Sequence, residues 1–291
     1  KKKKKKKNQK KKMFFVVLLL FSAFVHAEIC NVPTGGNVIN ATPAQVNDVV
    51  ALLKGQAAGI NGGKPLQPGD ELHLAGGTYT LTSRVAVTLT GTADKYIVIR
   101  SKEGEKAVIN RPRDNENILD ISVAYTYWYD IEMSGGSAGL RLEKDCHHNT
   151  FDKLEIHGSK HVIFRANSSG SKYYNNLIQN CHLHDPLGPG TMEVMYLGCN
   201  NNACQFYDNV ITGNHIHGTE KPGVTQGDGI EIKRGSYGNE VSDNVIYDTH
   251  YPGIFVYGWP GKANNRVLRN LIFNTGDHCM QVTSNADIIG N

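Results

Sequence analysis

The sequence lacks an apolar run long enough to cross a membrane comfortably. Its one long apolar stretch follows Met13, is preceded by positive charge and is followed by the small residue Ala27. These features are typical of a secretory signal peptide that is cleaved after Ala27. We therefore expect residues 1–27 to be a lysine run plus a signal peptide. The product would be secreted and extracellular, with no membrane attachment after cleavage.

An excess of positive charge is also missing once that segment is set aside. Residues 1–27 contain ten lysines and no acidic residue, so 21 Lys+Arg remain against 27 Asp+Glu, a net charge of about −6. This balance does not imply a non-specific nucleic-acid surface, and we expect no nucleic-acid partner. Binding of an acidic ligand would have to rest on locally placed cations.

Cysteine is infrequent, and its six copies all lie beyond residue 27. A secreted route permits disulfides, and only Cys199 and Cys204 are near neighbours in the sequence. We predict that these two cysteines form a disulfide. No second Cys/His pair at ligand spacing accompanies them, which disfavours a zinc site there.

Helical patterns are nearly absent. Thr42-Pro43-Ala44-Gln45 has the capping pattern of a helix start, apolar residues follow at helical spacing, and Gly55 ends the element. Downstream, short apolar runs separated by Gly, Asn and Asp predict strands. The predicted strands are Tyr96–Arg100, Ala107–Asn110, Ile118–Ser122 and Trp128–Met133. This pattern excludes a helical bundle and leaves a sandwich, a barrel or a solenoid.

A repeat decides among these architectures. Five ten-residue blocks align without gaps, start 27, 33, 30 and 26 residues apart, open with Asn and carry Leu or Ile at the eighth position. The blocks are Asn149–Gly158, Asn176–Asp185, Asn209–Gly218, Asn239–Asp248 and Asn265–Asn274. A unit of this length with strands and no helix predicts one coil of an all-β parallel β-helix. The aligned asparagines would form a ladder through the stacked coils.

In its repeat and its short strands, the chain resembles the right-handed parallel β-helix proteins of the pectate-lyase-like superfamily. The resemblance begins at Pro68-Gly69-Asp70 and Gly76-Gly77-Thr78-Tyr79 and continues through the five blocks. It implies a single-stranded right-handed β-helix domain over residues 28–291 with a short N-terminal capping helix, and no single activity. Residues 285–291 start another coil without a polar cap, so we expect an incomplete C-terminus or an open last rung.

Each block is followed by a second strand, and aligning these strands places outward residues in rows. The second strands are His161–Arg165, Met192–Tyr196, Gly229–Lys233, Gly253–Tyr257 and Cys279–Thr283. Glu231 and Lys233 alternate with buried isoleucines, so we expect them to share one outward face. Counting coil by coil predicts that Glu193 stacks on Glu231. It also puts Arg165 and Tyr257 in the row of Lys233.

Loop lengths point to the same face. The longest loop between a block and its second strand is Thr219–Gln226, which contains Lys221 and immediately precedes Asp228. The next longest, Pro186–Thr191, precedes Glu193. Because insertions on one side of a solenoid usually build its binding wall, we predict a groove at these residues.

The acidic residues of this face suggest a cation. Glu193 and Glu231 would lie about 5 Å apart on adjacent coils and repel each other, unless a cation or a shared proton relieves them. Ca²⁺ is the hard cation that a secreted carboxylate cluster would hold, with Asp228 as a third ligand. The alternative is neutralisation by the neighbouring basic side chains, which are Arg165, Lys233 and Arg234.

This arrangement is similar to the sites of alginate lyases and chondroitinase B, where acidic Ca²⁺ ligands sit beside a lysine base and an arginine. The resemblance implies that the three carboxylates hold Ca²⁺ and that Lys233 removes the sugar's C5 proton. Tyr257 would protonate the leaving oxygen or exchange roles with Lys233. The chain departs from the family because Tyr257 and Phe255 occupy the region expected for the arginine. The alternative for Lys233 is a solvated lysine paired with Glu231.

The leading hypothesis is therefore a secreted, monomeric polysaccharide lyase that cleaves an acidic, uronic-acid-containing polysaccharide by β-elimination. The candidate substrate-binding residues are Arg165, Lys221, Arg234, His250 and Phe255. The alternatives are a C5-epimerase, a glycoside hydrolase with Glu193 and Glu231 as a retaining pair, and a non-catalytic glycan-binding β-helix. A flat, loop-free face would favour the last of these.

Histidines recur at one position of the repeat. His157, His184 and His217 share the ninth place of their blocks, where Tyr247 and Phe273 replace them. Because aromatic side chains continue the stack, we expect a packing ladder there rather than a metal site.

Overall fold

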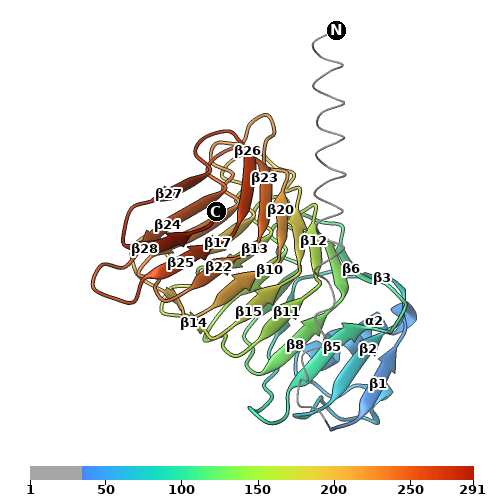
Figure 1. The fold of residues 1–291 in the computed structure, drawn as a ribbon. Coiled ribbons are helices and arrows are strands. Elements are labelled where there is room, and N and C mark those ends of the chain that lie inside the picture. Colours follow the sequence, from blue (N-terminus) through green and yellow to red (C-terminus); the bar gives the residue numbers. More distant parts are fainter. Residues whose placement is uncertain (1–34) are drawn as a thin grey trace. The chain divides into compact units, whose positions relative to one another are not determined.

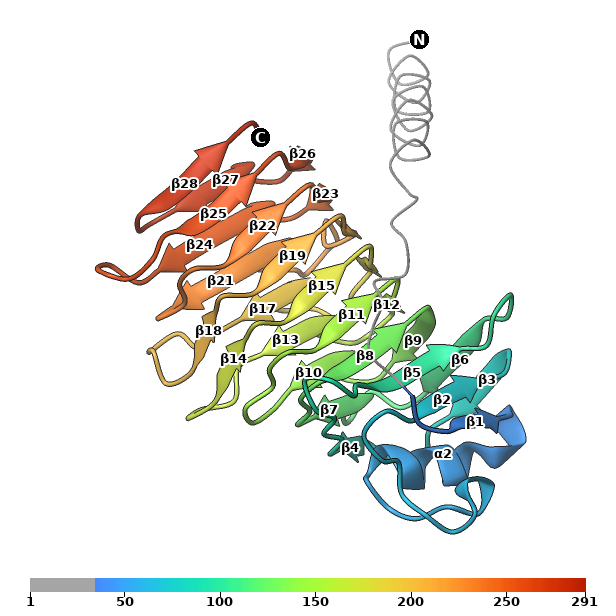
Figure 2. The same ribbon diagram turned by 60° about the horizontal axis from the view of Figure 1, so that its bottom comes forward.

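The structure, a computed structural model, describes residues 35–291, and the predicted lysine run and signal peptide lie outside them. Within residues 35–291 the chain winds in coils, and like strands of successive coils pair in parallel (Figure 1). Figure 2 shows the strands of successive coils lying side by side from the helical end to β28. The predicted right-handed parallel β-helix is confirmed.

Three parallel sheets run along the β-helix. The first sheet contains β1 (Val38–Ala41), β2 (Glu71–Leu74), β5 (Ile97–Ser101), β8 (Thr126–Tyr129), β11 (Thr150–Asp152), β15 (Leu177–Gln179), β19 (Val210–Thr212), β22 (Glu240–Ser242), β25 (Asn265–Leu268) and β28 (Ala286–Ile289). The second sheet contains β3 (Gly77–Thr80), β6 (Ala107–Arg111), β9 (Ile131–Gly135), β12 (Glu155–His157), β16 (His182–His184), β20 (His215–His217), β23 (Val245–Thr249) and β26 (Leu271–Thr275). The third sheet contains β4 (Val85–Val87), β7 (Leu119–Ile121), β10 (Leu140–Leu142), β13 (Phe164–Ala166), β17 (Met195–Leu197), β21 (Ile230–Arg234), β24 (Ile254–Gly258) and β27 (Met280–Val282). A short pair is formed by β14 (Lys172–Tyr174) and β18 (Gln205–Tyr207).

The expected helix lies at the N-terminal end of the described residues. It consists of a 3₁₀ turn, η1 (Pro43–Gln45), followed by α2 (Val46–Leu53), and a second 3₁₀ turn, η2 (Gly59–Asn61), comes later. The backbone N–H of Thr42 donates to Gln45 Oε1 at 2.9 Å, as the capping pattern predicts. Within residues 35–291, none of the helices combines the length and the apolar character that crossing a bilayer requires.

Each ten-residue block holds two strands rather than one, which corrects the sequence-based prediction. The fifth residue of every block has a positive φ, between 52° and 65°, and this residue turns the chain from the first sheet into the second. Asp130, with φ 55°, divides the predicted strand Trp128–Met133 into β8 and β9 in the same way. Left-handed backbone is uncommon outside glycine, so residues such as Lys153 and Arg269 gave no signal of this turn.

The predicted asparagine ladder is confirmed. Its members are Asn149, Asn176, Asn209, Asn239 and Asn265, all buried. Each side-chain Nδ2 donates to Oδ1 of the next asparagine at 2.9–3.0 Å, and each backbone N–H donates to the same oxygen. A second ladder, which sequence reasoning missed, joins Asn214, Asn244 and Asn270. These ladders satisfy backbone groups that the turns between sheets would otherwise leave buried and unpaired.

Replacing Asn209 by alanine should lower the free energy of unfolding by at least about 2 kcal/mol. The change removes partners of the buried Asn176 N–H and the Tyr173 carbonyl, and each unpaired group costs about 1–3 kcal/mol. Urea unfolding measures the loss. The exposed Asn264→Ala is the matched control and should stay within about 0.5 kcal/mol of the parent chain. Equal effects of the two substitutions would contradict the structural role of the ladder.

Cys199 and Cys204 form a disulfide, which confirms the predicted pair. The bridged loop follows β17 directly and carries Asn200. Among the described cysteines, Cys146 and Cys181 are free and buried, and Cys279 is free and exposed.

The last strand of the first sheet leaves apolar side chains uncovered. In β28, Ile288 is 47% exposed and Ile289 is 61% exposed. An open last rung was expected from the sequence, whereas an incomplete C-terminus stays a prediction.

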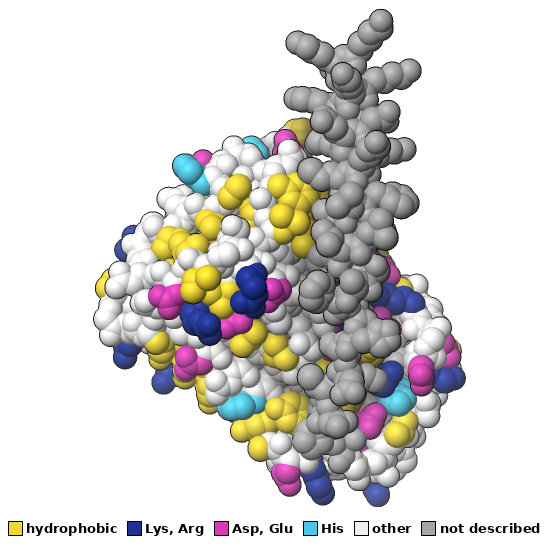
Figure 3. Space-filling view, viewed as in Figure 1, with side chains coloured by type: hydrophobic (Ala, Val, Ile, Leu, Met, Phe, Trp, Pro, Cys, Tyr) yellow, Lys and Arg dark blue, Asp and Glu magenta, His cyan; other side chains and the backbone are white. Residues whose placement is uncertain are grey.

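Charges of both signs are mixed on the surface. On the face drawn in Figure 3, basic side chains lie beside acidic ones, without a large patch of one sign. Ion pairs such as Arg266 with Glu240, at 2.8 Å, and Arg269 with Asp243, at 2.6 Å, join neighbouring coils.

Candidate active site

The third sheet carries Glu231 and Lys233, and its register corrects the predicted rows. Glu231 lies opposite Tyr196 on one side and Phe255 on the other. Tyr196 in turn lies opposite Arg165. Glu193 precedes β17 and does not stack on Glu231, so that prediction is wrong. Arg165 belongs to the row of Glu231 rather than to the row of Lys233.

The register error has a physical cause. Val194 and Met195 are both fully buried, so the inward–outward alternation changes phase at the start of β17. Met192 has a positive φ and belongs to a turn, not to the strand in which we had placed it. From β21 to β24 the register agrees with the predicted rows, since Glu231 lies opposite Phe255 and Arg234 lies opposite Gly258.

Three carboxylates nevertheless converge at the start of these strands. One oxygen from each of Glu193, Asp228 and Glu231 lies within 4.8 Å of the other two. All three side chains are buried, and four of their oxygens have no hydrogen-bond partner. Because burying unpaired carboxylates is costly, this cluster requires either protons or a cation.

Burial raises the pKa of each of these carboxyl groups. For Asp228, burial and then the charges of Glu231 and Glu193 raise the pKa to about 8. Burial is also the main cause of the raised pKa values of Glu193 and Glu231, opposed in part by Lys233. Without a cation, the cluster therefore holds at least one proton near neutral pH.

Stability should fall as the pH rises from about 4 to about 8 in the presence of a chelator. The folded state keeps the Asp228 proton until its pKa of about 8, whereas an unfolded chain releases it near 3.8. The contribution is thus complete below the unfolded pKa and is lost as the pH passes the folded pKa. Thermal unfolding across this window should show a shallower slope for Asp228→Asn, which cannot titrate. Parallel slopes for the two proteins would contradict the raised pKa.

Lys233 is buried as well, although the sequence suggested an exposed side chain. Its Nζ pairs with Glu231 Oε1. The same Nζ lies 4.8 Å from the centre of the Tyr196 ring and 4.6 Å from that of Tyr257. The side chain points away from the core of the coil but is enclosed between rings of the two neighbouring coils. The solvated-lysine alternative is therefore wrong, although its pairing with Glu231 is right.

A groove of about 540 Å³ opens over this cluster. Arg165, Glu193, Tyr196, Lys233 and Tyr257 line it. Thr191 and Gln226, from the two long loops, and Asn200, from the disulfide loop, also contribute to its walls. The face is thus neither flat nor free of loops.

Sequence reasoning missed several of these residues. Tyr196 lies opposite Glu231, the position that the predicted register gave to Glu193. His161 and Asn167 also line the groove. Arg165 is held there because its Nε donates to Asn167 Oδ1 at 3.0 Å, and burial followed by the charge of Arg141 lowers its pKa. A correct register would have revealed Tyr196, but the sequence held no signal for His161.

Two other predicted binding residues lie close to the groove. Phe255 stacks on Tyr257 with ring centres 4.2 Å apart. Arg234 lies 5.9 Å from the Tyr257 ring centre and lines an adjacent hollow of about 470 Å³ with Trp259.

Lys221 and His250 are not among the groove-lining residues, which corrects their assignment. Lys221 Nζ instead donates to Asp185 Oδ1 at 2.9 Å and to the Pro186 carbonyl. The His250 ring stacks on Tyr251, with ring centres 5.9 Å apart. Both side chains thus have local partners outside the groove lining.

The fold and the groove define a parallel β-helix protein with a buried acidic cluster beside an enclosed lysine. The chain belongs to the family described as the right handed beta helix region, whose model matches residues 116–291. It is 28% identical over 175 residues to the pectate lyase PEL9 of Emericella nidulans, an alignment covering 55% of this chain and 39% of that protein. The chain thus matches well under half the length of this relative.

Solved structures show the same fold. The alginate lyase from Paenibacillus sp. superimposes with a TM-score of 0.56 at 20% identity, covering 88% of this chain and 98% of that one. The pectate lyase Pel9A superimposes with a TM-score of 0.55 at 14% identity, covering 89% and 78% of the two chains. At these identities the likeness concerns the fold alone.

Proposed function

We propose that this chain is a polysaccharide lyase that cleaves an acidic, uronic-acid-containing polysaccharide by β-elimination. The observation that carries the proposal is Lys233, whose amine lies between two tyrosine rings beside three buried carboxylates in a loop-walled groove. The similarity to a pectate lyase and an alginate lyase agrees with it. The proposal includes secretion and action as a monomer.

β-Elimination requires three things of the site. A base removes the C5 proton, an acid protonates the leaving O4, and positive charge offsets the sugar carboxylate. Arg165 lines the groove, and in this proposal it binds that carboxylate. Lys233 is the base in this proposal, and its contact with Glu231 gives it a partner with which to exchange a proton.

The two tyrosines whose rings enclose Lys233 are the candidates for the acid in this proposal. Burial raises the pKa of Tyr196 and of Tyr257, with Glu231 the next cause for both, so both phenols stay protonated at neutral pH. Tyr196 also lies in register with Arg165, one coil away, which puts an acid and a carboxylate-binding cation on adjacent rungs. We therefore assign the acid role to Tyr196 rather than to Tyr257.

The buried, unpartnered oxygens of Glu193, Asp228 and Glu231 fit a hard cation such as Ca²⁺. When bound, the ion would supply positive charge that offsets the negative charge of the three carboxylates and of the substrate. The protonated Asp228 and the Lys233–Glu231 pair offer the alternative, a site that works without metal.

A substrate screen tests both parts of the proposal. We expect the purified chain to release products with the ultraviolet absorbance of a new C4–C5 double bond from alginate, pectate or a glycosaminoglycan. If Ca²⁺ is required, chelator should abolish this activity and added Ca²⁺ should restore it. Activity that is unchanged by chelator would contradict a requirement for Ca²⁺. Products without the double bond would favour one of the alternatives, either a glycoside hydrolase with Glu193 and Glu231 as the catalytic pair or a C5-epimerase.

A further inference from the structure

The second sheet carries a group of histidines that the proposed lyase site does not use. The sequence His-x-His occurs in β16, as His182 and His184, and again at the same register in β20, as His215 and His217. The predicted aromatic ladder is present, since His184 stacks on His157 and on His217 with ring centres 5.0 Å apart in both cases. His182 stands outside this ladder and stacks on His215, with ring centres 5.0 Å apart.

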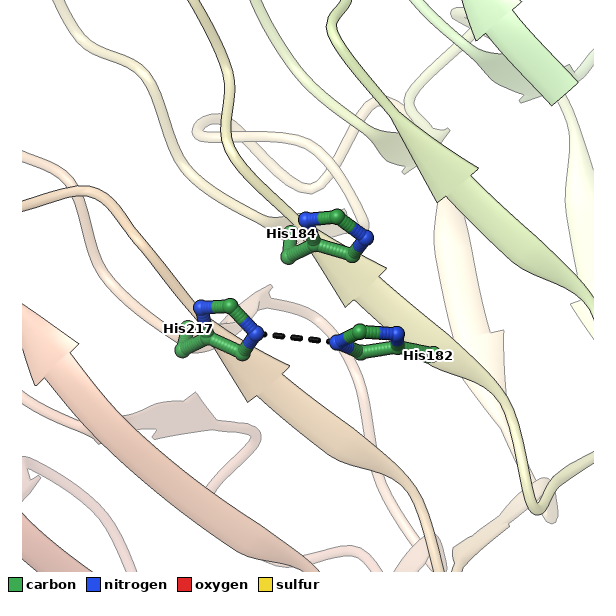
Figure 4. A group of neighbouring side chains, drawn as sticks. All are labelled: His182, His184 and His217. Atoms are coloured by element: carbon green, nitrogen blue, oxygen red, sulfur yellow. Dashed lines mark hydrogen bonds between the residues drawn. The ribbon is translucent and has the colours of Figure 1, made fainter. Parts of the chain in front are cut away.

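Three of these side chains converge (Figure 4). One ring nitrogen from each of His182, His184 and His217 lies within 4.8 Å of the other two. His182 Nε2 and His217 Nε2 face each other at 2.9 Å, and the His184 ring lies over His182 with ring centres 3.9 Å apart. The rings come from adjacent coils, so any ion held between them would join two rungs of the sheet.

His184 has the arrangement of a metal ligand. Its Nδ1 lies 2.9 Å from Asp185 Oδ2, so the ring proton belongs on Nδ1. Its Nε2 is then a bare acceptor, and that atom is buried without a hydrogen-bond partner. A carboxylate on the far nitrogen is the usual means by which proteins orient a ligating imidazole. Asp185 is itself held by Lys221 at 2.9 Å.

We propose that His182, His184 and His217 form a binding site for a divalent transition-metal ion of the zinc class. Ligands at about 2.0–2.1 Å in a tetrahedral site lie roughly 3.3 Å from one another, so on binding the rings would move closer and turn their nitrogen lone pairs toward the common ion. Glu155 lies beside the trio, with Oε1 3.5 Å from His184 Nε2 and 3.8 Å from His182 Nδ1. Nitrogen donors favour such ions over Ca²⁺, which distinguishes this site from the carboxylate cluster.

Calorimetric titration of the untagged, chelator-treated chain with Zn²⁺ tests this site. We expect one ion per chain, and Co²⁺ in its place should give the visible absorption of a tetrahedral complex. His217→Gln or His182→Gln should weaken binding at least about 10-fold, and Asp185→Asn should weaken it about 10–100-fold through the orientation of His184. The matched control is His157→Gln. His157 belongs to the same ladder but not to the trio, so this variant should bind Zn²⁺ as the parent chain does.

A second readout does not require the variants to be equally stable. Because an ion that binds only the folded state raises its stability, the Tm of the parent chain should rise with the logarithm of the Zn²⁺ concentration. This rise should disappear in His217→Gln and persist in His157→Gln. Absence of saturable binding, or equal binding by parent and His217→Gln, would overturn the proposal and leave a hydrogen-bonded packing cluster.

Discussion

Lys233→Ala should lower the turnover of the polysaccharide substrate by about 10²–10⁴-fold, the usual contribution of a positioned acid or base. The outward face that the sequence predicts for Lys233 would let this change leave folding intact. The buried position of Lys233 corrects that expectation, because alanine would leave the Glu231 carboxylate buried without its cation. A fall in activity would therefore have to be separated from a fall in stability.

Lys233→Arg makes this separation. Arginine keeps the positive charge beside Glu231 but does not give up its proton at neutral pH, so it cannot act as the base. We expect the Arg variant to retain more stability than the Ala variant and to be as inactive. The exposed Lys172→Ala serves as the control and should retain full turnover. Substantial activity in a folded Lys233→Arg protein would exclude this residue as the base.

Tyr196→Phe should reduce turnover by a comparable 10²–10⁴-fold, while Tyr257→Phe should cost less than about 10-fold. Phenylalanine keeps each ring packed against Lys233 and removes only the hydroxyl group. The difference is expected because Tyr196 lies beside Arg165, whereas Tyr257 stacks on Phe255. Initial rates at saturating substrate, with unfolding curves for both variants, provide the measurement. A larger loss in Tyr257→Phe would transfer the acid role to that residue.

The coils could be predicted because their polar residues are repeated. The asparagine that opens each block makes the same hydrogen bonds at the same turn of every coil. The spacing of these asparagines in the sequence therefore gives the number of residues per coil. The Cys199–Cys204 disulfide could also be predicted, since only these two cysteines are close in sequence. In contrast, the turn inside each block went unseen because its fifth residue varies among Lys, Asn, Gly, Asp and Arg.

The candidate site could be predicted in composition but not in register. Glu193, Asp228 and Glu231 were grouped together, and their oxygens do converge. The phase change at Val194 and Met195 depends on how a turn of irregular length enters β17, which alternation alone does not encode. The burial of Lys233 likewise depends on rings from two other coils, so it follows only from the three-dimensional stacking.

The central claim is that the groove performs β-elimination with Lys233 as the base. The most direct measurement is the ultraviolet absorbance of products formed from uronate polysaccharides by the parent chain and by Lys233→Arg under identical conditions. We predict that absorbance from a new C4–C5 double bond will accumulate with the parent chain and fall at least about 100-fold with the variant. Products that lack the double bond, or equal accumulation by both proteins, would contradict the claim.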